Sequence, residues 1–327
     1  MTAAEKGSDM KIRIFVATAS LAASAGLVGL AGSAQAALYT TCVGDGGAVT
    51  VGGDLVVPAG QSCTLTGTKV KGTVTVEAGA DLVASGATFN TNVTVRQNGY
   101  LDLTDTTVKG SVTTQAAFGA HFQDSSVKTG ITADKGFVYA VDATLGGTVR
   151  SSAGELYVSG STLSGALTGE GNLYTDVYDS TVKGALTVGG NTLGGVLCAS
   201  EVEGNTTYRN NADTLQLGGE GTLGSCAGAT YLGGNLTVTD NTAATVLDNT
   251  IVRGGLTATG NSPVLGLGPL ARVRGAITGE TTAATASPSV AARKAAPQDR
   301  GDALAKKVGQ RVADARADAS AAGDSDL

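Results

Sequence analysis

The chain has 327 residues, of which 22 are basic and 28 acidic, so its formal net charge is −6. This mildly negative balance gives no reason to expect nucleic-acid binding, which favours a basic face. Glycine is abundant at 49 residues and proline is rare at 5, which excludes collagen and the Pro-rich class of disordered chains.

The N-terminal residues 1–36 predict a secretory signal peptide. Lys11 and Arg13 precede an apolar run of small residues that ends in Ala-Gln-Ala at residues 34–36. A charged segment, an apolar segment and an A-x-A motif in this order are typical of a signal that is cleaved. An uncleaved anchor is the alternative, but the high Ala, Gly and Ser content favours cleavage. We therefore expect a secreted protein, extracellular or associated with the cell surface, without a membrane span after cleavage.

A repeated phrase organises the middle of the chain. Residues 105–113 read DTTVKGSVT, and residues 179–187 read DSTVKGALT. With Gly110 as the origin, equivalent positions recur in twelve units over residues 51–279, in steps of 18 to 21 residues except for one step of 30. A fixed period of this length is the sequence signature of a repeat architecture.

Apolar residues occupy two fixed columns in these units. The residue two positions before the origin is apolar in all twelve units, as in Val108, Val127 and Leu145. The residue two positions after the origin is apolar in every unit except at Thr206, and the next residue is threonine in ten of the twelve units. Alternating apolar and polar residues predict short strands with one buried face, and intervening Gly, Asp and Asn residues predict turns.

A unit of about 19 residues cannot bury an apolar face alone, so the units must stack on one another. We predict an all-β fold, a single-stranded parallel β-helix (β-solenoid) of about twelve rungs of 18–21 residues, over residues 37–280. The columns by themselves do not reveal the handedness of the coil.

Four cysteines, Cys42, Cys63, Cys198 and Cys226, lie in this predicted solenoid. An exported chain favours two disulfides, and four cysteines allow three pairings. We expect Cys42–Cys63, because 21 residues place them one rung apart, and Cys198–Cys226, because they bracket much of the 30-residue step. The spacings match no zinc motif, and we expect no metal site.

Residues 281–327 predict a linker and a disordered or weakly helical C-terminal tail. Residues 281–298 are rich in Ala, Thr, Ser and Pro, and beyond them Leu304, Val308 and Val312 recur at helical spacing. This apolar stripe is thin for an independent domain. The tail is a candidate cap for the open end of the solenoid, where the last rung leaves backbone groups unpaired.

The recurring order G-x-[VIL]-T-x, behind a signal peptide, resembles that of the secreted bacterial right-handed parallel β-helix repeat proteins. This group includes the pectin-lyase-like superfamily and, more distantly, the polymer-forming bactofilins, which differ in lacking a cleaved signal. The resemblance covers residues 51–279 and implies a right-handed coil. It specifies architecture and hardly any activity.

The enzymes of this group combine clustered carboxylates with a basic residue. The resemblance therefore points to Asp105, Asp124, Asp142 and Arg150 as cation or substrate candidates, since carboxylates one rung apart are suitable ligands for Ca²⁺. Glycine takes the same position as these Asp residues in other rungs, which favours a turn role. We assign no catalytic residue and expect no cofactor, with Ca²⁺ only if the chain is an enzyme.

Aromatic residues give a second set of candidates. Tyr100, Tyr157 and Tyr174 fall in comparable parts of their rungs and are candidates for stacking on sugar rings. Ordinary strand tyrosines are the alternative reading, and the lack of tryptophan weakens the carbohydrate hypothesis. His121 is the single histidine, and we expect it on the outer face of a strand.

These patterns predict a secreted, non-catalytic β-solenoid that acts as a structural or surface-interaction protein, adhesive or polymer-forming. Its expected partners are itself, end to end, or a cell-envelope or extracellular polysaccharide, and not nucleic acid. The lack of a recognisable catalytic motif favours a non-enzymatic role. The alternative is a β-helix polysaccharide lyase or hydrolase. A third hypothesis, an ice-binding rod, follows from the threonine column and the T-x-T pair Thr73/Thr75.

Overall fold

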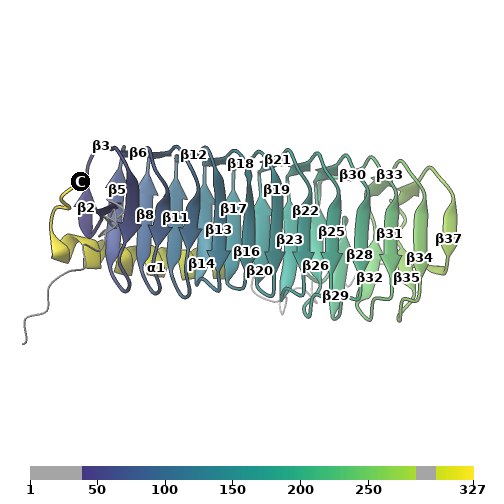
Figure 1. Ribbon diagram of the computed structural model, residues 1–327. Coiled ribbons are helices and arrows are strands. Elements are labelled where there is room, and N and C mark those ends of the chain that lie inside the picture. Colours follow the sequence, from purple (N-terminus) through teal and green to yellow (C-terminus); the bar gives the residue numbers. More distant parts are fainter. Residues whose placement is uncertain (1–38, 285–299) are drawn as a thin grey trace, which may run out of the picture. The chain divides into compact units, whose positions relative to one another are not determined.

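The chain coils into a stack of short parallel strands. The computed structural model describes residues 39–284 and 300–327, and each strand pairs with the equivalent strand one coil away (Figure 1). The coils form a parallel β-solenoid of three sheets, two with thirteen strands and one with twelve. This confirms the predicted fold class. The predicted signal peptide at 1–36 lies outside the described residues and stays a prediction.

The three sheets are named A, B and C. Sheet A contains β1 (Tyr39–Thr41), β4 (Asp54–Val57), β7 (Val74–Val76), β10 (Val93–Val95), β13 (Ser111–Gln115), β16 (Gly130–Asp134), β19 (Thr148–Ser152), β22 (Leu167–Glu170), β25 (Leu186–Gly189), β28 (Thr206–Arg209), β31 (Leu236–Thr239), β34 (Leu256–Thr259) and β37 (Ile277–Gly279). Sheet B contains β2 (Gly44–Gly46), β5 (Ser62–Thr66), β8 (Asp81–Ser85), β11 (Tyr100–Thr104), β14 (Gly119–Gln123), β17 (Phe137–Val141), β20 (Glu155–Ser159), β23 (Tyr174–Tyr178), β26 (Gly195–Cys198), β29 (Thr214–Leu217), β32 (Ala244–Leu247), β35 (Leu265–Leu267) and β38 (Thr281–Ala283). Sheet C contains β3 (Thr50–Val51), β6 (Lys69–Val70), β9 (Thr88–Phe89), β12 (Thr107–Val108), β15 (Ser126–Val127), β18 (Thr144–Leu145), β21 (Thr162–Leu163), β24 (Thr181–Val182), β27 (Glu201–Val202), β30 (Thr230–Leu232), β33 (Thr250–Val252) and β36 (Arg272–Val273).

The predicted apolar columns form the shared interior of the stack. Val108 pairs with Val127, and Val127 pairs with Leu145, in neighbouring strands of sheet C. All three side chains are fully buried. Burying an aliphatic side chain of this size contributes about 1.5–3 kcal/mol relative to leaving it exposed, so one continuous core stabilises all the rungs together.

The stack extends beyond the twelve units in which the glycine–threonine pattern recurs. β1 and β2 form a first coil that lacks the glycine–threonine pattern, and thirteen rungs replace the expected twelve. At the other end, β38 extends to Ala283, past the predicted boundary at residue 280. These outer coils are held by backbone pairing to β4, β5 and β35, which side-chain patterns do not reveal.

The repeated phrase is explained position by position in its first copy. Asp105 has a positive φ of 49°, which suits a turn. The Thr106 hydroxyl accepts a hydrogen bond from Ala87 N in the preceding rung at 3.2 Å, while Thr106 N donates to Ser125 Oγ in the next rung at 3.1 Å. A Cβ at Gly110 would lie 2.5 Å from the backbone of Thr91, so glycine is needed where two rungs approach this closely.

A ladder of asparagines supports the turn between sheets A and B. Asn172 N donates to Asn191 Oδ1, Asn191 N to Asn211 Oδ1, and Asn211 N to Asn241 Oδ1. All four residues are buried, so their side chains satisfy backbone groups that water does not reach.

Both expected disulfides are present. Cys42 pairs with Cys63 in the adjacent rung, and Cys198 pairs with Cys226. The second bridge joins the enlarged loop between β29 and β30 to the end of β26. The backbone of this loop also bonds the Gln216 side chain at Gly219, Leu223 and Gly224. Two disulfides are typical of a protein from an oxidising compartment.

The tail forms one long helix, α1 (Arg300–Ala322), on the outer face of sheet B (Figure 1). Leu304 and Val308 are buried against aromatic side chains of the sheet, including Phe137. The thin stripe predicted at most a weak helix because the sequence does not show what it packs against. Contacts with sheet B supply the missing stabilisation. In the described part of the chain, no helix combines the length and the apolar character that crossing a membrane requires.

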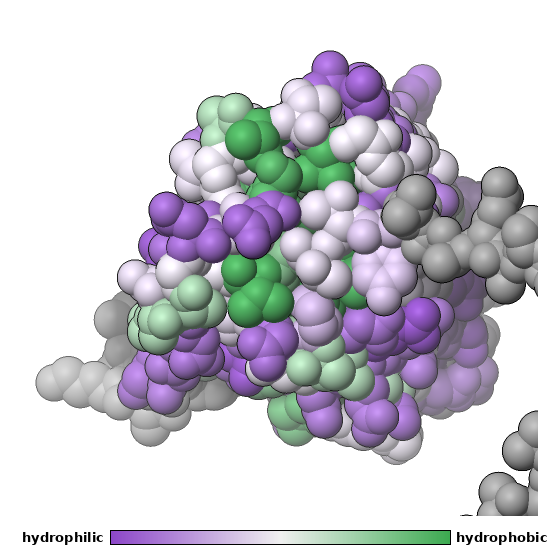
Figure 2. Space-filling view, turned by 60° about the vertical axis from the view of Figure 1, so that its left-hand side comes forward, coloured by the Kyte–Doolittle hydropathy of each residue, from purple (hydrophilic) through white to green (hydrophobic). Residues whose placement is uncertain are grey.

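The residues that follow α1 close the N-terminal end of the stack. Asp45 N on β2 donates to Gly323 O at 2.8 Å, and Ser325 N donates to Asp45 O at 2.9 Å. Leu327 packs against the core. Around this end, hydrophobic groups lie as separate islands between polar side chains (Figure 2). The tail therefore caps the first rung, and not the last one for which it was a candidate cap.

Candidate functional site

Threonines form a column in register on the outer face of sheet A. The members occupy the central outward position of successive strands: Thr75, Thr94, Thr113, Thr132, Thr168, Thr187, Thr207, Thr237, Thr257 and Thr278. All are partly or fully exposed, because α1 packs on sheet B instead. The column offers hydroxyl and methyl groups at the strand spacing of about 4.8 Å.

Two details modify this column. Arg150 takes the place of threonine between Thr132 and Thr168. On β31 and β34 a second column begins, where Thr239 pairs with Thr259 beside the first one. The face is therefore hydroxyl-rich along its length, interrupted by one cation.

The sugar-stacking candidates Tyr100 and Tyr174 lie beneath α1. They are 0% and 6% exposed and belong to the cluster that contains Leu304. The Tyr100 hydroxyl donates to Asp102 Oδ2 and the Tyr174 hydroxyl to Glu155 Oε2, both at 2.7 Å. Burial first, and then these carboxylates, raise the pKa of both phenols. In this arrangement neither ring presents a face to a ligand.

Tyr157, the third candidate, belongs to a row of rings that crosses sheet B. The centroids of His121 and Tyr139 lie 5.0 Å apart in a stacked arrangement, those of Tyr139 and Tyr157 5.3 Å apart, and those of Tyr157 and Tyr178 5.4 Å apart. Each ring therefore packs on the ring of the next rung. Such packing is worth about 0.5–1.5 kcal/mol a pair.

His121 lies on the outer face of β14, as expected. Its Nδ1 lies 2.8 Å from Asp102 Oδ2, the same oxygen that accepts the Tyr100 hydroxyl. A His–Asp pair is a partial form of the arrangement that activates a nucleophile. Among the described residues, however, no serine, threonine or cysteine hydrogen-bonds the imidazole. The pair orients the imidazole and ties β11 to β14.

The carboxylate candidates Asp105, Asp124 and Asp142 occupy one turn in adjacent rungs. Their φ angles are 49°, 51° and 51°, and the equivalent position is Gly86 in one preceding rung, with a φ of 63°. Backbone conformation thus explains the choice of residue. Arg150 lies apart from them, on sheet A. Over the described residues no group of three or more His, Cys, Asp or Glu side chains is placed to hold a metal ion.

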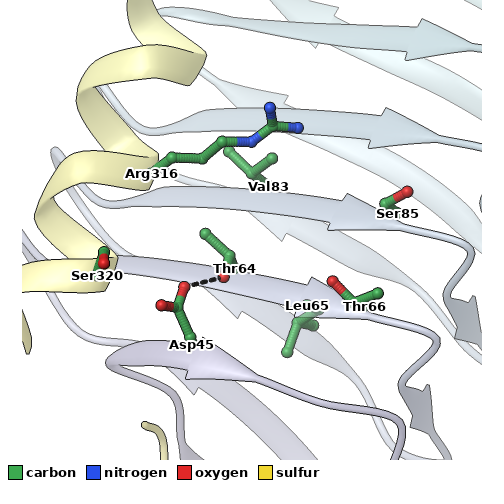
Figure 3. A pocket seen from close by; sticks show the side chains of 8 residues that line it. All are labelled: Asp45, Thr64, Leu65, Thr66, Val83, Ser85, Arg316 and Ser320. Carbon is green, nitrogen blue, oxygen red and sulfur yellow. Dashed lines mark hydrogen bonds between the residues drawn. The ribbon is translucent and has the colours of Figure 1, made fainter. Parts of the chain in front are cut away.

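A shallow depression lies where α1 crosses sheet B near the N-terminal end (Figure 3). Its volume is about 460 Å³, and its lining residues are Asp45, Thr64, Leu65, Thr66, Val83, Ser85, Arg316 and Ser320. Asp45 accepts a hydrogen bond from the Thr64 hydroxyl, and Arg316 reaches across Val83 (Figure 3). The depression is open and shared between polar and apolar groups, so it lacks the enclosure typical of a small-molecule site.

Ion pairs fasten α1 over these groups. Arg311 Nη2 lies 2.7 Å from Asp81 Oδ1, and Lys307 Nζ lies 2.7 Å from Glu155 Oε1. Arg300 Nη1 lies 3.0 Å from Asp176 Oδ1. The sequence reasoning missed this coverage. The sequence feature that could have indicated it is the spacing of Arg300, Lys307 and Arg311, which recur at helical intervals beside Leu304 and Val308.

No family model matches the chain, and neither does any curated protein or solved structure. The fold itself defines the class, a parallel β-solenoid with a helix across one of its three faces. The resemblance to pectin-lyase-like proteins and bactofilins stays a prediction.

Proposed function

We propose that this chain is a secreted, non-catalytic β-solenoid that binds a cell-envelope or extracellular polysaccharide along its side. The observation that carries the proposal is the open threonine column of sheet A, which repeats a hydrogen-bonding group at every rung but one from Thr75 to Thr278. A polymer also repeats its hydroxyl groups at regular intervals, so a flat hydroxyl-bearing face can contact many of its units at once. Each contact is weak and the sum is substantial.

Two further observations support a side-binding role. The cation or substrate candidates Asp105, Asp124 and Asp142 adopt the positive φ that their turn requires, which explains these residues without catalysis. End-to-end assembly requires an open N-terminal edge, and Asp45 is hydrogen-bonded to Gly323 and Ser325 there. This cap on the N-terminal end favours interaction along the side of the stack over end-to-end assembly.

Co-sedimentation with insoluble polysaccharides, combined with a turnover assay on soluble ones, tests this function. The variant Thr187→Val/Thr207→Val removes two paired hydroxyls of sheet A and keeps the β-branched shape that suits a strand. We expect it to weaken binding by about tenfold, equivalent to 1.4 kcal/mol. The matched control Thr162→Val/Thr181→Val changes a paired position on sheet C and should bind as the wild type does.

Two results contradict the proposal. One is measurable cleavage of a polysaccharide that is lost in Asp124→Ala, which would establish the enzyme alternative. The other is equal binding by both double variants, which would remove the threonine column from the interaction.

Ice binding is the second candidate, favoured by the paired columns on β31 and β34. There Thr237 and Thr257 stand beside Thr239 and Thr259 in a two-by-two T-x-T array. Thermal hysteresis that is present in the wild type and lost in Thr237→Val/Thr257→Val would support it. Freezing at the equilibrium point in both proteins would exclude it.

A further inference from the structure

One column of residues follows the edge at which sheet C turns into sheet A. Each member comes directly after a strand of sheet C, and its backbone N–H donates to the last residue of the sheet C strand in the preceding rung. Thus Lys109 N donates to Phe89 O at 2.8 Å, Lys128 N to Val108 O at 2.9 Å. The same bond recurs along the stack up to Arg274 N and Val252 O. The column is therefore a continuous edge, one residue a rung.

This edge is basic, although the whole chain carries a net charge of −6. Six of its side chains are cations, and all six are exposed: Lys71, Lys109, Lys128, Lys183, Arg253 and Arg274. Glu203 is the one acidic residue of the column, and the other positions between Lys71 and Arg274 are Asn, Gly or Ser. The row spans ten rung steps, or about 48 Å at a strand spacing of about 4.8 Å.

None of the six cations forms an ion pair with another described residue. The ion pairs within the described part of the chain involve Arg96, Arg209, His121 and three basic residues of α1. The nearest regular row of acids contains Asp105, on the far side of sheet C and four residues from Lys109. The basic row is therefore available to an external anion.

The column two residues further on, on the sheet A side of the row, begins with Asp54 and carries polar side chains in several of the following rungs. It includes Thr73, Asn92, Ser111 and Thr148. Asn92 Oδ1 accepts hydrogen bonds from Ser111 N and Ser111 Oγ at 2.9 and 3.1 Å, which fixes this column against the rung above. A ligand on the basic row thus meets fixed hydrogen-bonding groups beside the charges.

We propose that the basic row binds a linear polyanion, a flexible unbranched polymer with an anionic group on its repeating units. This inference rests on the proposed side-binding function and names the charge class of its ligand. A single narrow row fits a flexible strand that can lie along it. A duplex nucleic acid turns its phosphates away within each helical turn, and a membrane contacts a broad face. Lysine and arginine charges release counterions from such a polymer, so the affinity falls with salt.

The experiment measures binding of sodium polyphosphate, dextran sulfate and polygalacturonate by fluorescence anisotropy over a range of salt concentrations. Lys109→Glu/Lys128→Glu reverses two adjacent charges of the row. The control Lys135→Glu/Lys306→Glu makes the same change of net charge at exposed lysines outside it. We expect the first variant to lose about tenfold or more in affinity at low salt, with a shallower salt slope, and the control to lose less than about threefold.

Several outcomes overturn the inference. Equal losses in both variants would show that only net charge matters, and tighter binding of duplex DNA or of anionic vesicles would assign the row to another partner. If the protein binds neutral polysaccharides and none of the three polyanions, the row has no such role, while the proposed function stands. If it binds no polymer at all, both proposals fail.

Discussion

Buried hydroxyl and amide side chains join each rung to the next by hydrogen bonds to its backbone. Thr106, Ser125 and Ser180 accept backbone hydrogen bonds from neighbouring rungs, as the asparagine ladder does at the opposite turn. Because a buried unpaired donor or acceptor costs about 1–3 kcal/mol, these side chains matter as much as the aliphatic columns. Two residues test this view in opposite directions.

Thr206 is the single polar residue in its apolar column. It lies between Leu186 and Leu236, it is fully buried, and its hydroxyl has no hydrogen-bond partner among the described residues. Thr206→Val should therefore raise the free energy of unfolding by about 1 kcal/mol, measured by chemical denaturation. Thr207→Val, at the partly exposed neighbouring position, should change it little. A loss of stability in Thr206→Val would show that the hydroxyl is satisfied in solution.

Asn211 differs from Thr206 in that its buried side chain is fully hydrogen-bonded. Its Oδ1 accepts from Asn191 N at 3.0 Å, and its Nδ2 donates to Val188 O at 3.1 Å. Asn211→Ala should lower the free energy of unfolding by about 2–3 kcal/mol, since both buried backbone groups lose their partners. Asn205→Ala removes a similar but exposed bond to Asn235 N and should cost clearly less. Equal costs for the two variants would contradict the role of burial.

The sequence predicted the rungs well because their causes are local and repeated. Alternation, glycine at close approaches and threonine on outward positions each follow from the columns, and so do both disulfides. The asparagine ladder and the position of α1 were not predicted, because each depends on which residues meet across distant parts of the chain. Tyr100 and Tyr174 illustrate the limit for sites. Their place in the rung was clear from sequence, but their burial follows from a helix 200 or 126 residues further on, at Arg300.

At the scale of elements, the position of α1 on sheet B changes the surroundings of the carboxyl groups beneath it. Asp81 is the clearest case. Burial raises the pKa of its carboxyl above the ordinary value of 3.8, although Arg311 acts in the opposite direction by hydrogen bonding and charge. The folded protein thus holds the Asp81 proton more tightly than the unfolded chain does, and the ionised form is the less favourable one.

A pH titration of stability tests this balance. The contribution of Asp81 is complete below pH 3.8, its unfolded value, and is lost as the pH rises through the raised pKa of the folded state. Asp81→Asn cannot ionise, so it should match the wild type near pH 3 and gain relative stability toward neutral pH. Arg311→Ala should deepen the loss. If Asp81→Asn becomes less stable than the wild type as the pH rises, the ion pair outweighs burial.

At the scale of the whole described stack, the two ends differ. The N-terminal end is covered by Gly323–Leu327 through backbone bonds to Asp45, whereas the last rung exposes Ile277 at 48% and leaves β37 paired on one side only. Unpaired strand edges favour association. The cap therefore disfavours end-to-end assembly, because a continuous polymer needs two uncapped ends.

Truncation after Gly323 removes the residue that bonds Asp45 O and the Leu327 side chain. We expect the truncated protein to associate as its concentration rises, because the first rung then offers a free edge, and sedimentation velocity measures this. Ser325→Ala is the control, since it keeps the backbone donor. A truncated protein that stays monomeric at high concentration would show that the covering residues do not prevent assembly.

The reach of α1 also divides the rungs into two groups. Its contacts extend from β2 to β23, where Arg300 meets Asp176, and one rung further to the carbonyl of Leu193. The coils after that rung lie beyond its ion pairs in the described residues. In a one-dimensional stack, coils tied together open together, and untied ones fray from the free end. Amide hydrogen exchange should therefore be slowest in the coils beneath the helix and should quicken step by step toward β37.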